Sequence, residues 1–315
     1  MNRKNPTITF ILALFLGMYG GHYFYLGKYK KAILYLFTVG LFGIGWLYDI
    51  FKYFLAMTSS KKSEPIVQIE TEIESEVLSD EIEPGPYLQS FEGVDQYNFD
   101  KELELYFLKS LKRTREVDYD RFMKVSKNFD NHSTFVVFDL ETTGLKPREN
   151  EIIEIGAIRY VDNEPCEMFH TYIKPKKKIS ARITQINGIT NDMVQEAPSI
   201  QEVLPYFLDF IGDDTLVAHN VKFDMSFILH QLYINEYKKP KNKTVDTLDL
   251  ARDCFVRFDE NKGMEVPLKN YKLMTLKEKL GLGELGSHNA IDDCKVCGYI
   301  YLKTMEYEYC TLEID

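Results

Sequence analysis

The sequence has few cysteines, and those it has do not form the even, closely spaced set that is typical of small secreted, disulfide-bonded domains. There are five in 315 residues, namely Cys166, Cys254, Cys294, Cys297 and Cys310. Cys294 and Cys297 form one C-x-x-C pair, and no second pair is present to complete a four-ligand zinc site. Their spacing also fits one face of a helix, so we expect a reduced pair.

Positive charge is also scarce, since 38 Lys and Arg face 48 Asp and Glu for a net charge of −10. The balance is +5 over residues 1–56, −7 over 57–130 and −8 over 131–315. An acidic domain is a poor non-specific binder of nucleic acid. Any nucleic-acid function therefore has to depend on bound metal and on lysine clusters. Candidates lie at 174–178 and 238–243, and solvated loops are the alternative for both.

The length allows about two domains, and the first of them is strongly apolar. Residues 7–26 form a nearly uninterrupted apolar run, close to the roughly 20 residues that cross a bilayer as a helix. A basic turn at 27–31 leads to a second apolar run at 32–57. A signal peptide is the competing interpretation of the first run, but no small-residue cleavage site follows it. We predict a two-helix transmembrane hairpin over residues 1–57.

Glycines support this hairpin, because three on each span allow two helices to approach closely. The pattern G-x-x-G-x-H-x-F-Y-L-G at 17–27, with G-x-G-W-x-x-D at 43–49, resembles the two-transmembrane (TM-two) domain. His22 and Asp49 are polar residues in apolar surroundings. Either they have a function or pair with each other, or they lie near the helix ends at the depth of the lipid headgroups. The outer ends of the hairpin carry five basic residues and the turn carries three, which favours cytoplasmic termini. The lack of a disulfide pattern downstream favours the same orientation. We therefore expect a membrane-bound protein with a cytoplasmic catalytic domain.

Two segments separate the hairpin from the rest of the chain. Residues 58–97 carry a dense run of Glu and Asp that ends in Pro84-Gly85-Pro86, and we predict an acidic, flexible linker. Residues 98–130 place leucines and Phe107 on one side of a charged sequence, which predicts a helical connector. The remaining domain is expected over 131–315.

One stretch organises that domain, namely residues 134–144, T-F-V-V-F-D-L-E-T-T-G. Its β-branched and aromatic residues predict a buried strand. Because side chains alternate along a strand, Asp139 and Glu141 point to the same side. Two carboxylates held together at a buried strand end repel each other, and a divalent cation relieves that repulsion. An acidic turn without a metal is the alternative.

Two later stretches add polar groups to this pair. Strands alternate with helices along the chain, which is the pattern of an α/β domain. Asp224 follows H-N-V-K-F and lies just inside a predicted helix. The stretch S-H-N-A-I-D-D at 287–293 is predicted to open the last long helix, on which His288 and Asp293 are five residues apart and face one cleft. Asp292 is a geometric competitor of Asp293.

Four carboxylates and a histidine then stand at the ends of elements. Oxygen ligands of this kind suit Mg²⁺ or Mn²⁺. Two such ions clamp the attacking and leaving oxygens in phosphodiester hydrolysis, and a histidine that titrates near neutral pH is suited to deprotonate the attacking water. Helix capping by 219–220 and a helix-dipole role for 292–293 are the alternatives.

The motifs F-D-L-E-T-T-G, H-N-V-K-F-D and H-N-A-I-D-D resemble those of the DEDDh (DnaQ-like) 3′–5′ exonucleases, and I-N-G-I-T at 186–190 is similar to the proofreading-type branch. The resemblance implies a ribonuclease H-like mixed sheet flanked by helices. It implies metal ligation by Asp139, Glu141, Asp224 and Asp293, and catalysis by these four with His288 as general base. It also implies substrate binding by Thr142, Thr143, Gly144, Leu145, Asn220 and Phe223.

We therefore expect a membrane-anchored exonuclease that uses two Mg²⁺ or Mn²⁺ ions to release nucleoside 5′-monophosphates from single-stranded DNA 3′ ends. An RNA-trimming exonuclease with the same site is one alternative, distinguished by how its pocket treats the 2′-hydroxyl. A non-catalytic, membrane-tethered nucleic-acid binding module is the other. Membrane contact is expected through residues 7–57.

Overall fold

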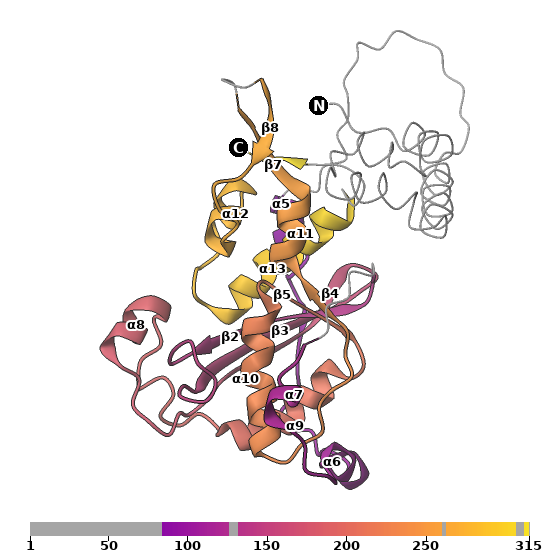
Figure 1. The fold of residues 1–315 in the computed structure, drawn as a ribbon, viewed down its shortest axis with the longest axis vertical. Coiled ribbons are helices and arrows are strands. Elements are labelled where there is room, and N and C mark those ends of the chain that lie inside the picture. Colours follow the sequence, from indigo (N-terminus) through magenta and orange to yellow (C-terminus); the bar gives the residue numbers. More distant parts are fainter. Residues whose placement is uncertain (1–83, 126–131, 260–262, 307–311, 315) are drawn as a thin grey trace, which may run out of the picture. The chain divides into compact units, whose positions relative to one another are not determined.

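The computed structural model describes residues 84–125, 132–259, 263–306 and 312–314 (Figure 1). The predicted hairpin over residues 1–57 and the linker up to residue 83 lie outside these ranges. Among the helices within them, we find none that is both long and apolar enough to cross a bilayer.

A six-stranded mixed sheet forms the centre of the domain, in the order β1-β4-β3-β2-β5-β6. Its strands are β1 (Asp95–Gln96), β2 (Phe135–Thr142), β3 (Ile152–Val161), β4 (Glu164–Tyr172), β5 (Thr215–Ala218) and β6 (Thr244–Asp246). β3 lies between β2 and β4 and is antiparallel to both, whereas β5 runs parallel to both β2 and β6. The predicted mixed sheet flanked by helices is confirmed.

The helices connect and cover these strands (Figure 1). Those after β4 are α8 (Ala181–Asn187), α9 (Ile200–Ile211), α10 (Val221–Ile234), α11 (Thr247–Cys254), α12 (Leu273–Lys279) and α13 (Ala290–Glu306). α9 begins with a capping box in which Ser199 and Glu202 satisfy each other's backbone N–H groups. A small second sheet has the order β8-β7-β9, with β7 at Phe255–Asp259, β8 at Met264–Pro267 and β9 at Leu312–Glu313.

The two faces of β2 pack against different helices. Val136, Phe138 and Leu140 belong to the main core together with residues of α9 and α10. Phe135 faces the other way, and its ring lies 4.7 Å from that of Tyr301 in α13. Because side chains alternate, Asp139 and Glu141 also lie on the α13 face.

Residues 84–97 belong to the folded domain, which differs from the prediction of a flexible linker through residue 97. The hydroxyl of Tyr87, on α5 (Pro84–Gln89), donates to the Lys295 carbonyl of α13 at 2.6 Å. Asp95 and Gln96 pair with β4 as an edge strand. The dense acidic run lies before residue 84, and within 84–97 only Glu92 and Asp95 are acidic. The aromatic side chains of this segment bury enough apolar surface to hold it on the domain.

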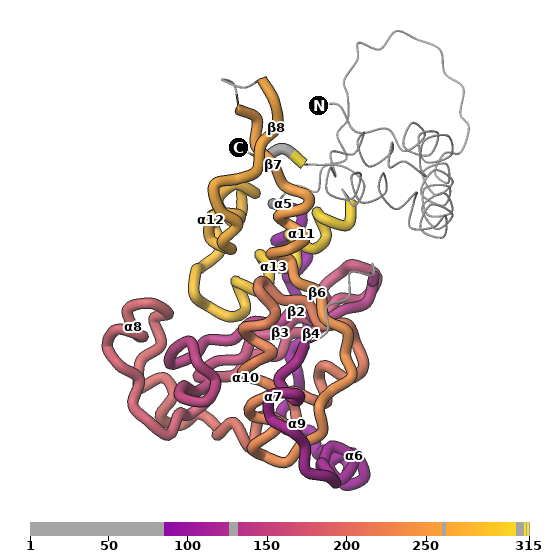
Figure 2. Tube along the Cα trace, viewed as in Figure 1, coloured from indigo at the N-terminus to yellow at the C-terminus, as the bar shows by residue number. Residues whose placement is uncertain are grey.

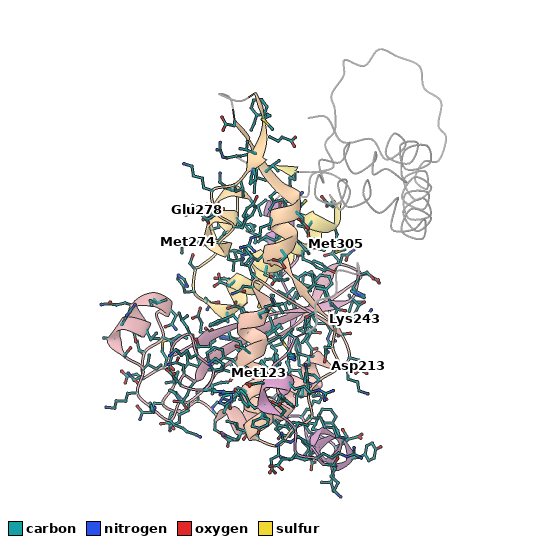
Figure 3. All side chains as sticks on the ribbon, in the orientation of Figure 1. Met123, Asp213, Lys243, Met274, Glu278 and Met305 are labelled. Carbon is teal, nitrogen blue, oxygen red and sulfur yellow. The ribbon has the colours of Figure 1, made fainter. Side chains whose placement is uncertain are left out.

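The predicted helical connector consists of two short helices, α6 (Leu105–Leu111) and α7 (Tyr119–Phe122), with extended chain between them. Figure 2 follows this segment alongside α10, and the hydroxyl of Tyr119 lies 2.6 Å from Nδ1 of His230 on that helix. Met123, labelled in Figure 3, packs against the main core. The segment therefore acts as a strap on the domain.

The two cysteines of the C-x-x-C pair lie on one helix, α13, as their spacing predicts. Cys294 and Cys297 are free and buried on α13. The Cys294 thiol donates to the carbonyl of Gly156 at 3.4 Å, and Sγ of Cys297 lies 3.4 Å from Oγ1 of Thr247. Burial raises the pKa of both thiols, so they pack as neutral groups.

We predict that Tyr97→Ala lowers the melting temperature of the domain by about 10 °C. Tyr97 is 6% exposed, its ring contacts Phe169 and Phe210, and its hydroxyl donates to Asp209 at 2.8 Å. Truncating a buried aromatic costs about 3–5 kcal/mol, and each kcal/mol lowers the melting temperature of a domain of this size by about 2–4 °C. Tyr106→Ala is the matched control, since Tyr106 is 82% exposed. Equal melting temperatures for the two variants in thermal unfolding would contradict the packing of this segment.

Candidate active site

The site begins where β2 ends, on the face that α13 covers. Asp139 pairs with Gly156 of β3 across the sheet, and Glu141 pairs with Glu154. A Cβ atom on Gly156 would lie 2.7 Å from the carbonyl carbon of Ala290, the first residue of α13. Gly156 therefore allows the start of α13 to approach the sheet closely, which brings the carboxylates of its first turn over Asp139.

His288 lies two residues before α13, and not on the helix as the sequence predicts. Its backbone is left-handed, with φ of 57°, and α13 begins at Ala290. This turn still brings the ring to the site, because the candidate ligand atoms of Glu141, His288 and Asp293 lie within 4.8 Å of one another. The expected grouping of these three residues is present, but a turn and not helical periodicity produces it.

The loop that carries His288 is held by a buried lysine. Nζ of Lys277, on α12, donates to the carbonyls of Leu285 at 2.8 Å and Gly286 at 3.1 Å, and to Oγ of Ser287 at 2.7 Å. Lys277 is itself buried, so these bonds are shielded from water. The ammonium group thereby fixes the backbone up to the residue before His288.

Asp292 and Asp293 differ in their partners. Oδ2 of Asp292 accepts from the Gly286 N–H at 2.9 Å, and its Oδ1 accepts from Lys295 at 3.1 Å. Both oxygens of Asp292 thus have partners, one in the loop before α13 and one on α13 itself. Asp293 instead groups with Glu141 and His288.

Asp224 contributes the fourth carboxylate from the first turn of α10 and is 3% exposed. Burial raises its pKa, and the charge of Glu141 raises it further, whereas the backbone of Leu140 lowers it by a hydrogen bond. Leu140 lies between Asp139 and Glu141 on β2, so Asp224 reaches the same strand end.

The electrostatics of the four carboxyls point to a cation. Burial, followed by the charges of Asp224, Asp293 and Glu141, raises the pKa of Asp139 well above its usual value. Burial also raises the pKa of Glu141 to about 7 and that of Asp293 to about 6. Bringing these groups together without a counter-ion is unfavourable, and a divalent cation among them removes both the repulsion and the desolvation penalty. The donor set of carboxylate oxygens and an imidazole fits Mg²⁺ or Mn²⁺.

Sequence reasoning missed a fifth carboxylate, Glu154, which is 1% exposed on β3. Its Oε1 lies 2.7 Å from Nε2 of His170 on β4, and its Oε2 accepts from the Ala290 N–H at 3.4 Å. It therefore ties the sheet to the start of α13. The signal in the sequence is a single Glu inside the apolar run 152–158.

Asn187, at the end of α8, is a second missed residue. Its side-chain amide donates to Oε2 of Glu141 at 3.2 Å, which lowers the pKa of that carboxyl and so partly offsets the effect of burial. It belongs to the I-N-G-I-T segment, whose sequence resembles the proofreading-type branch. The sequence alone does not predict that this segment contacts Glu141.

The predicted substrate-binding residues after β2 form a turn beside the carboxylates. Oγ1 of Thr142 donates to the Gly144 carbonyl at 2.7 Å, and Oγ1 of Thr143 accepts from the Glu151 N–H at 2.9 Å. Leu145 is 81% exposed at the tip of this turn. The turn is thus fixed by its own hydrogen bonds and presents one apolar side chain to solvent.

The other two predicted substrate-binding residues lie at the start of α10. Asn220 is exposed, has a left-handed backbone with φ of 67°, and donates its N–H to Oδ1 of Asp246 at 2.9 Å. Its side chain makes no capping hydrogen bond with α10, which leaves it available to a ligand. Phe223 is partly buried, with its ring 5.2 Å from that of Phe227.

The two lysine clusters differ in their surroundings. The N–H groups of Lys176 and Lys177 bind the Glu151 carboxylate at 3.0 and 3.2 Å, which places the first cluster near the Thr143 turn. In the second cluster, Lys238 and Lys239 donate to backbone carbonyls of the strap at residues 110 and 124. The first cluster is therefore placed for substrate contact, whereas the second fastens the strap.

Comparison with known proteins identifies related domains. The family model described as Exonuclease matches residues 136–301, and the model described as TM2 domain matches residues 2–51. The chain is 39% identical over 191 residues to the PolC-type DNA polymerase III of Thermotoga petrophila, covering 59% of this chain and 13% of that protein. It is 42% identical over 176 residues to the PolC-type enzyme of Caldanaerobacter subterraneus, covering 55% of this chain and 12% of that protein.

Among solved structures, the chain is similar to E. coli Exonuclease I in complex with a dA16 oligonucleotide. The TM-score is 0.47 and the identity 20%, with 56% of this chain and 42% of that chain covered. The chain thus spans about an eighth of the length of the polymerases that it matches, and under half of this structure.

We predict that, without metal, the melting temperature falls as pH rises from about 4 to about 8. The folded-state pKa values of Glu141, about 7, and Asp293, about 6, exceed the ordinary values near 4. The folded state therefore holds more protons than the unfolded chain in this window, and it loses stability as they dissociate. Mn²⁺ binding to the folded state should restore this loss, so it should raise the melting temperature more at about pH 8 than at about pH 5.5.

Thermal unfolding in EDTA and in Mn²⁺ measures both effects. Asp139→Asn is the control, because it removes one of the mutually repelling charges and one oxygen ligand; it should flatten the pH dependence and diminish the Mn²⁺ shift. A melting temperature that rises with pH in EDTA, or a Mn²⁺ shift that is equal at the two pH values, would show that the cluster is not a metal site.

Proposed function

We propose that the described domain is a metal-dependent 3′–5′ exonuclease. The chain belongs to the exonuclease family, whose model matches residues 136–301. The observation that carries this proposal is the grouping of Glu141, His288 and Asp293 within 4.8 Å, beside the raised pKa values of Asp139 and Asp224. A structural cluster of acids would be expected to pair with lysines or arginines. Here the charges of Asp224, Asp293 and Glu141 raise the pKa of Asp139, and Lys277 lowers only the pKa of Asp293.

Asp139, Glu141, Asp224 and Asp293 would hold two Mg²⁺ or Mn²⁺ ions. When bound, the ions supply charge neutralisation for the attacking and leaving oxygens of a phosphodiester. The protein buries Asp224, leaves Asp139, Glu141 and Asp293 partly exposed, and fixes Glu141 through the Asn187 amide. This arrangement provides a preorganised site for the charge that develops at phosphorus.

His288 would act as the general base that takes a proton from the attacking water. Its side chain is exposed, so water reaches it, and the loop before it is fixed by Lys277 and by Asp292. A base on a fixed loop keeps its ring within reach of a proton at one position, which is what general-base catalysis requires.

The 3′ end of the substrate would lie on the Thr142–Gly144 turn, with Leu145 against a base and Asn220 and Phe223 on the other side. The exposure of Leu145 and the uncapped side chain of Asn220 support this placement. Apolar contact with a base is tolerant of sequence, as an exonuclease requires.

DNA is the proposed substrate, because the two relatives described above are named as DNA polymerases. The match of residues 2–51 to the TM2 domain supports anchoring through residues 7–57, outside the described residues. Three free, buried cysteines of the described part fit a reducing compartment, so we place the catalytic domain on the cytoplasmic side.

We predict that the full chain, purified in detergent, releases nucleoside 5′-monophosphates from single-stranded DNA in the presence of Mg²⁺ or Mn²⁺. Asp293→Asn should lower this rate by more than about 100-fold. That loss is larger than the effect of removing a residue that only supports a metal ligand. Asp292→Asn is the matched control and should lose less than about tenfold, because its remaining oxygen still accepts from the Gly286 N–H. Digestion of a 5′-labelled strand, with product chromatography, measures both.

Matched DNA and RNA strands are used in the same assay. Faster digestion of RNA than of DNA would make RNA the substrate, and the assignment of the site residues would stand. Tight binding of either strand without digestion would support a non-catalytic tether instead. Equal losses for the Asp292 and Asp293 variants would contradict the assignment of Asp293 as the ligand.

We predict that His288→Ala lowers kcat by about 10²- to 10⁴-fold, the usual contribution of a general base, with little change in Mn²⁺ affinity. The structure makes this test necessary, because a ring nitrogen of His288 lies in the same group of candidate ligand atoms as Glu141 and Asp293. Mn²⁺ titration by calorimetry, beside turnover at saturating Mn²⁺, separates the two roles. A large loss of Mn²⁺ affinity with unchanged saturated turnover would make His288 a ligand and not the base.

A further inference from the structure

A pocket of about 620 Å³ opens beside Asn220, and Asn220 alone of its lining residues has a role in the assignments above. Its walls come from the junction of β5 and α10, from α11, and from the loop that leads into α12. Figure 3 marks α12 by its labelled residues Met274 and Glu278. The volume lies within the range of about 300–1,000 Å³ that ligand sites occupy.

The lining of this pocket is cationic, in a chain whose net charge is −10. Arg252, Lys269 and Lys272 line it, and no Asp or Glu is among the lining residues. Arg252 also contacts Asp249 at 3.3 Å, with its own side chain 56% exposed. An exposed pair of this kind contributes about 0–1 kcal/mol, so it does not prevent the guanidinium from binding a phosphate.

The pocket has a rigid inner wall. Nδ1 of His219 lies 3.0 Å from Oγ1 of Thr247, and its Nε2 lies 2.8 Å from the carbonyl of Tyr271. Burial lowers the pKa of His219, so the ring joins the walls as a neutral group. The hydroxyl of Tyr271 donates to the Phe255 carbonyl at 3.0 Å and accepts from the Leu268 N–H at 3.1 Å. The wall is therefore held in place before any ligand binds.

The pocket is also next to the catalytic carboxylates. Asn220 lines the pocket and precedes Asp224 by four residues at the start of α10. At about 1.5 Å of rise per residue, the two residues are about one helical turn apart. A strand whose 3′ end lies at the carboxylates can therefore extend past Asn220 into the pocket.

We propose that this pocket binds the phosphodiester backbone of the substrate strand on the 5′ side of the scissile bond, through Arg252, Lys269 and Lys272. The proposal rests on the proposed exonuclease function. It explains how a domain with an overall negative charge holds a polyanion, since the cations are gathered in one pocket beside the site.

The experiment compares two substrates of the full chain, purified in detergent. A single-stranded oligonucleotide reaches from the carboxylates into the pocket, whereas the p-nitrophenyl ester of thymidine 5′-monophosphate occupies the catalytic site alone. The test variant is Arg252→Ala/Lys269→Ala/Lys272→Ala. We expect KM for the oligonucleotide to rise about tenfold or more with kcat nearly unchanged, and hydrolysis of the ester to be unaffected. The negative slope of log(kcat/KM) against log salt should become shallower by about 2, because each of the three lost contacts with a single strand removes about 0.7 from its magnitude.

The matched control variant removes three exposed cations elsewhere, Lys109→Ala/Arg115→Ala/Arg121→Ala, with the same change in net charge. It should leave both substrates unaffected. Equal effects of the two triple variants on the oligonucleotide, no effect of the pocket variant, or a parallel loss on the ester would each overturn the pocket assignment while the exonuclease function stands.

Failure of the exonuclease function itself is seen separately, as a wild-type chain that hydrolyses neither substrate. Binding of a labelled oligonucleotide in EDTA, followed by fluorescence anisotropy, then tests the pocket alone. Weaker binding by the pocket variant than by the control variant supports the proposal, and equal binding by the two overturns it.

Discussion

Mutual repulsion among buried carboxyls is the constraint on which the rest of this domain depends. Burial raises the pKa of Asp139, Asp224 and Glu141. The charges of Asp224 and Glu141 raise the pKa of Asp139 further, and the charge of Glu141 raises that of Asp224. Such a cluster is unfavourable in a metal-free fold, so other interactions have to hold it together. The hydrophobic contacts of β2 with α9 and α10 on one face, and of Phe135 with Tyr301 on the other, supply that stabilisation away from the charges.

Each carboxyl reaches the cluster from a different element, and each element is positioned by a specific contact. Gly156 lets the start of α13 approach the sheet, and Glu154 accepts a hydrogen bond from Ala290 at the same point. Lys277 and Asp292 then shape the loop before that helix from its two sides. The candidate base is therefore placed by residues that do not themselves belong to the group of metal ligands.

Much of the fold and most of the site could be predicted from the sequence, and the exceptions have physical causes. Alternation along β2 correctly placed Asp139 and Glu141 on one face, since strand periodicity is local. Helical spacing put His288 on α13, but its positive φ places it in a turn. Composition suggested a flexible linker through residue 97, whereas Tyr87 and Tyr97 are buried in contacts with residues more than 70 positions away. Long-range contacts of this kind, like the pairing of Glu154 with His170, leave no periodic signal.

The distribution of charge connects the catalytic cluster with the surface around it. Residues 131–315 carry a balance of −8, so the surroundings of the site repel a nucleic acid at long range. Divalent cations at the carboxyls would reverse the sign at the point of reaction, and Arg252, Lys269 and Lys272 reverse it in the neighbouring pocket. Attraction is then confined to the path of one strand and falls away beyond a Debye length of about 8–10 Å. An acidic domain with local positive sites thus favours a strand whose end is already in the cleft over nucleic acid that merely touches its surface.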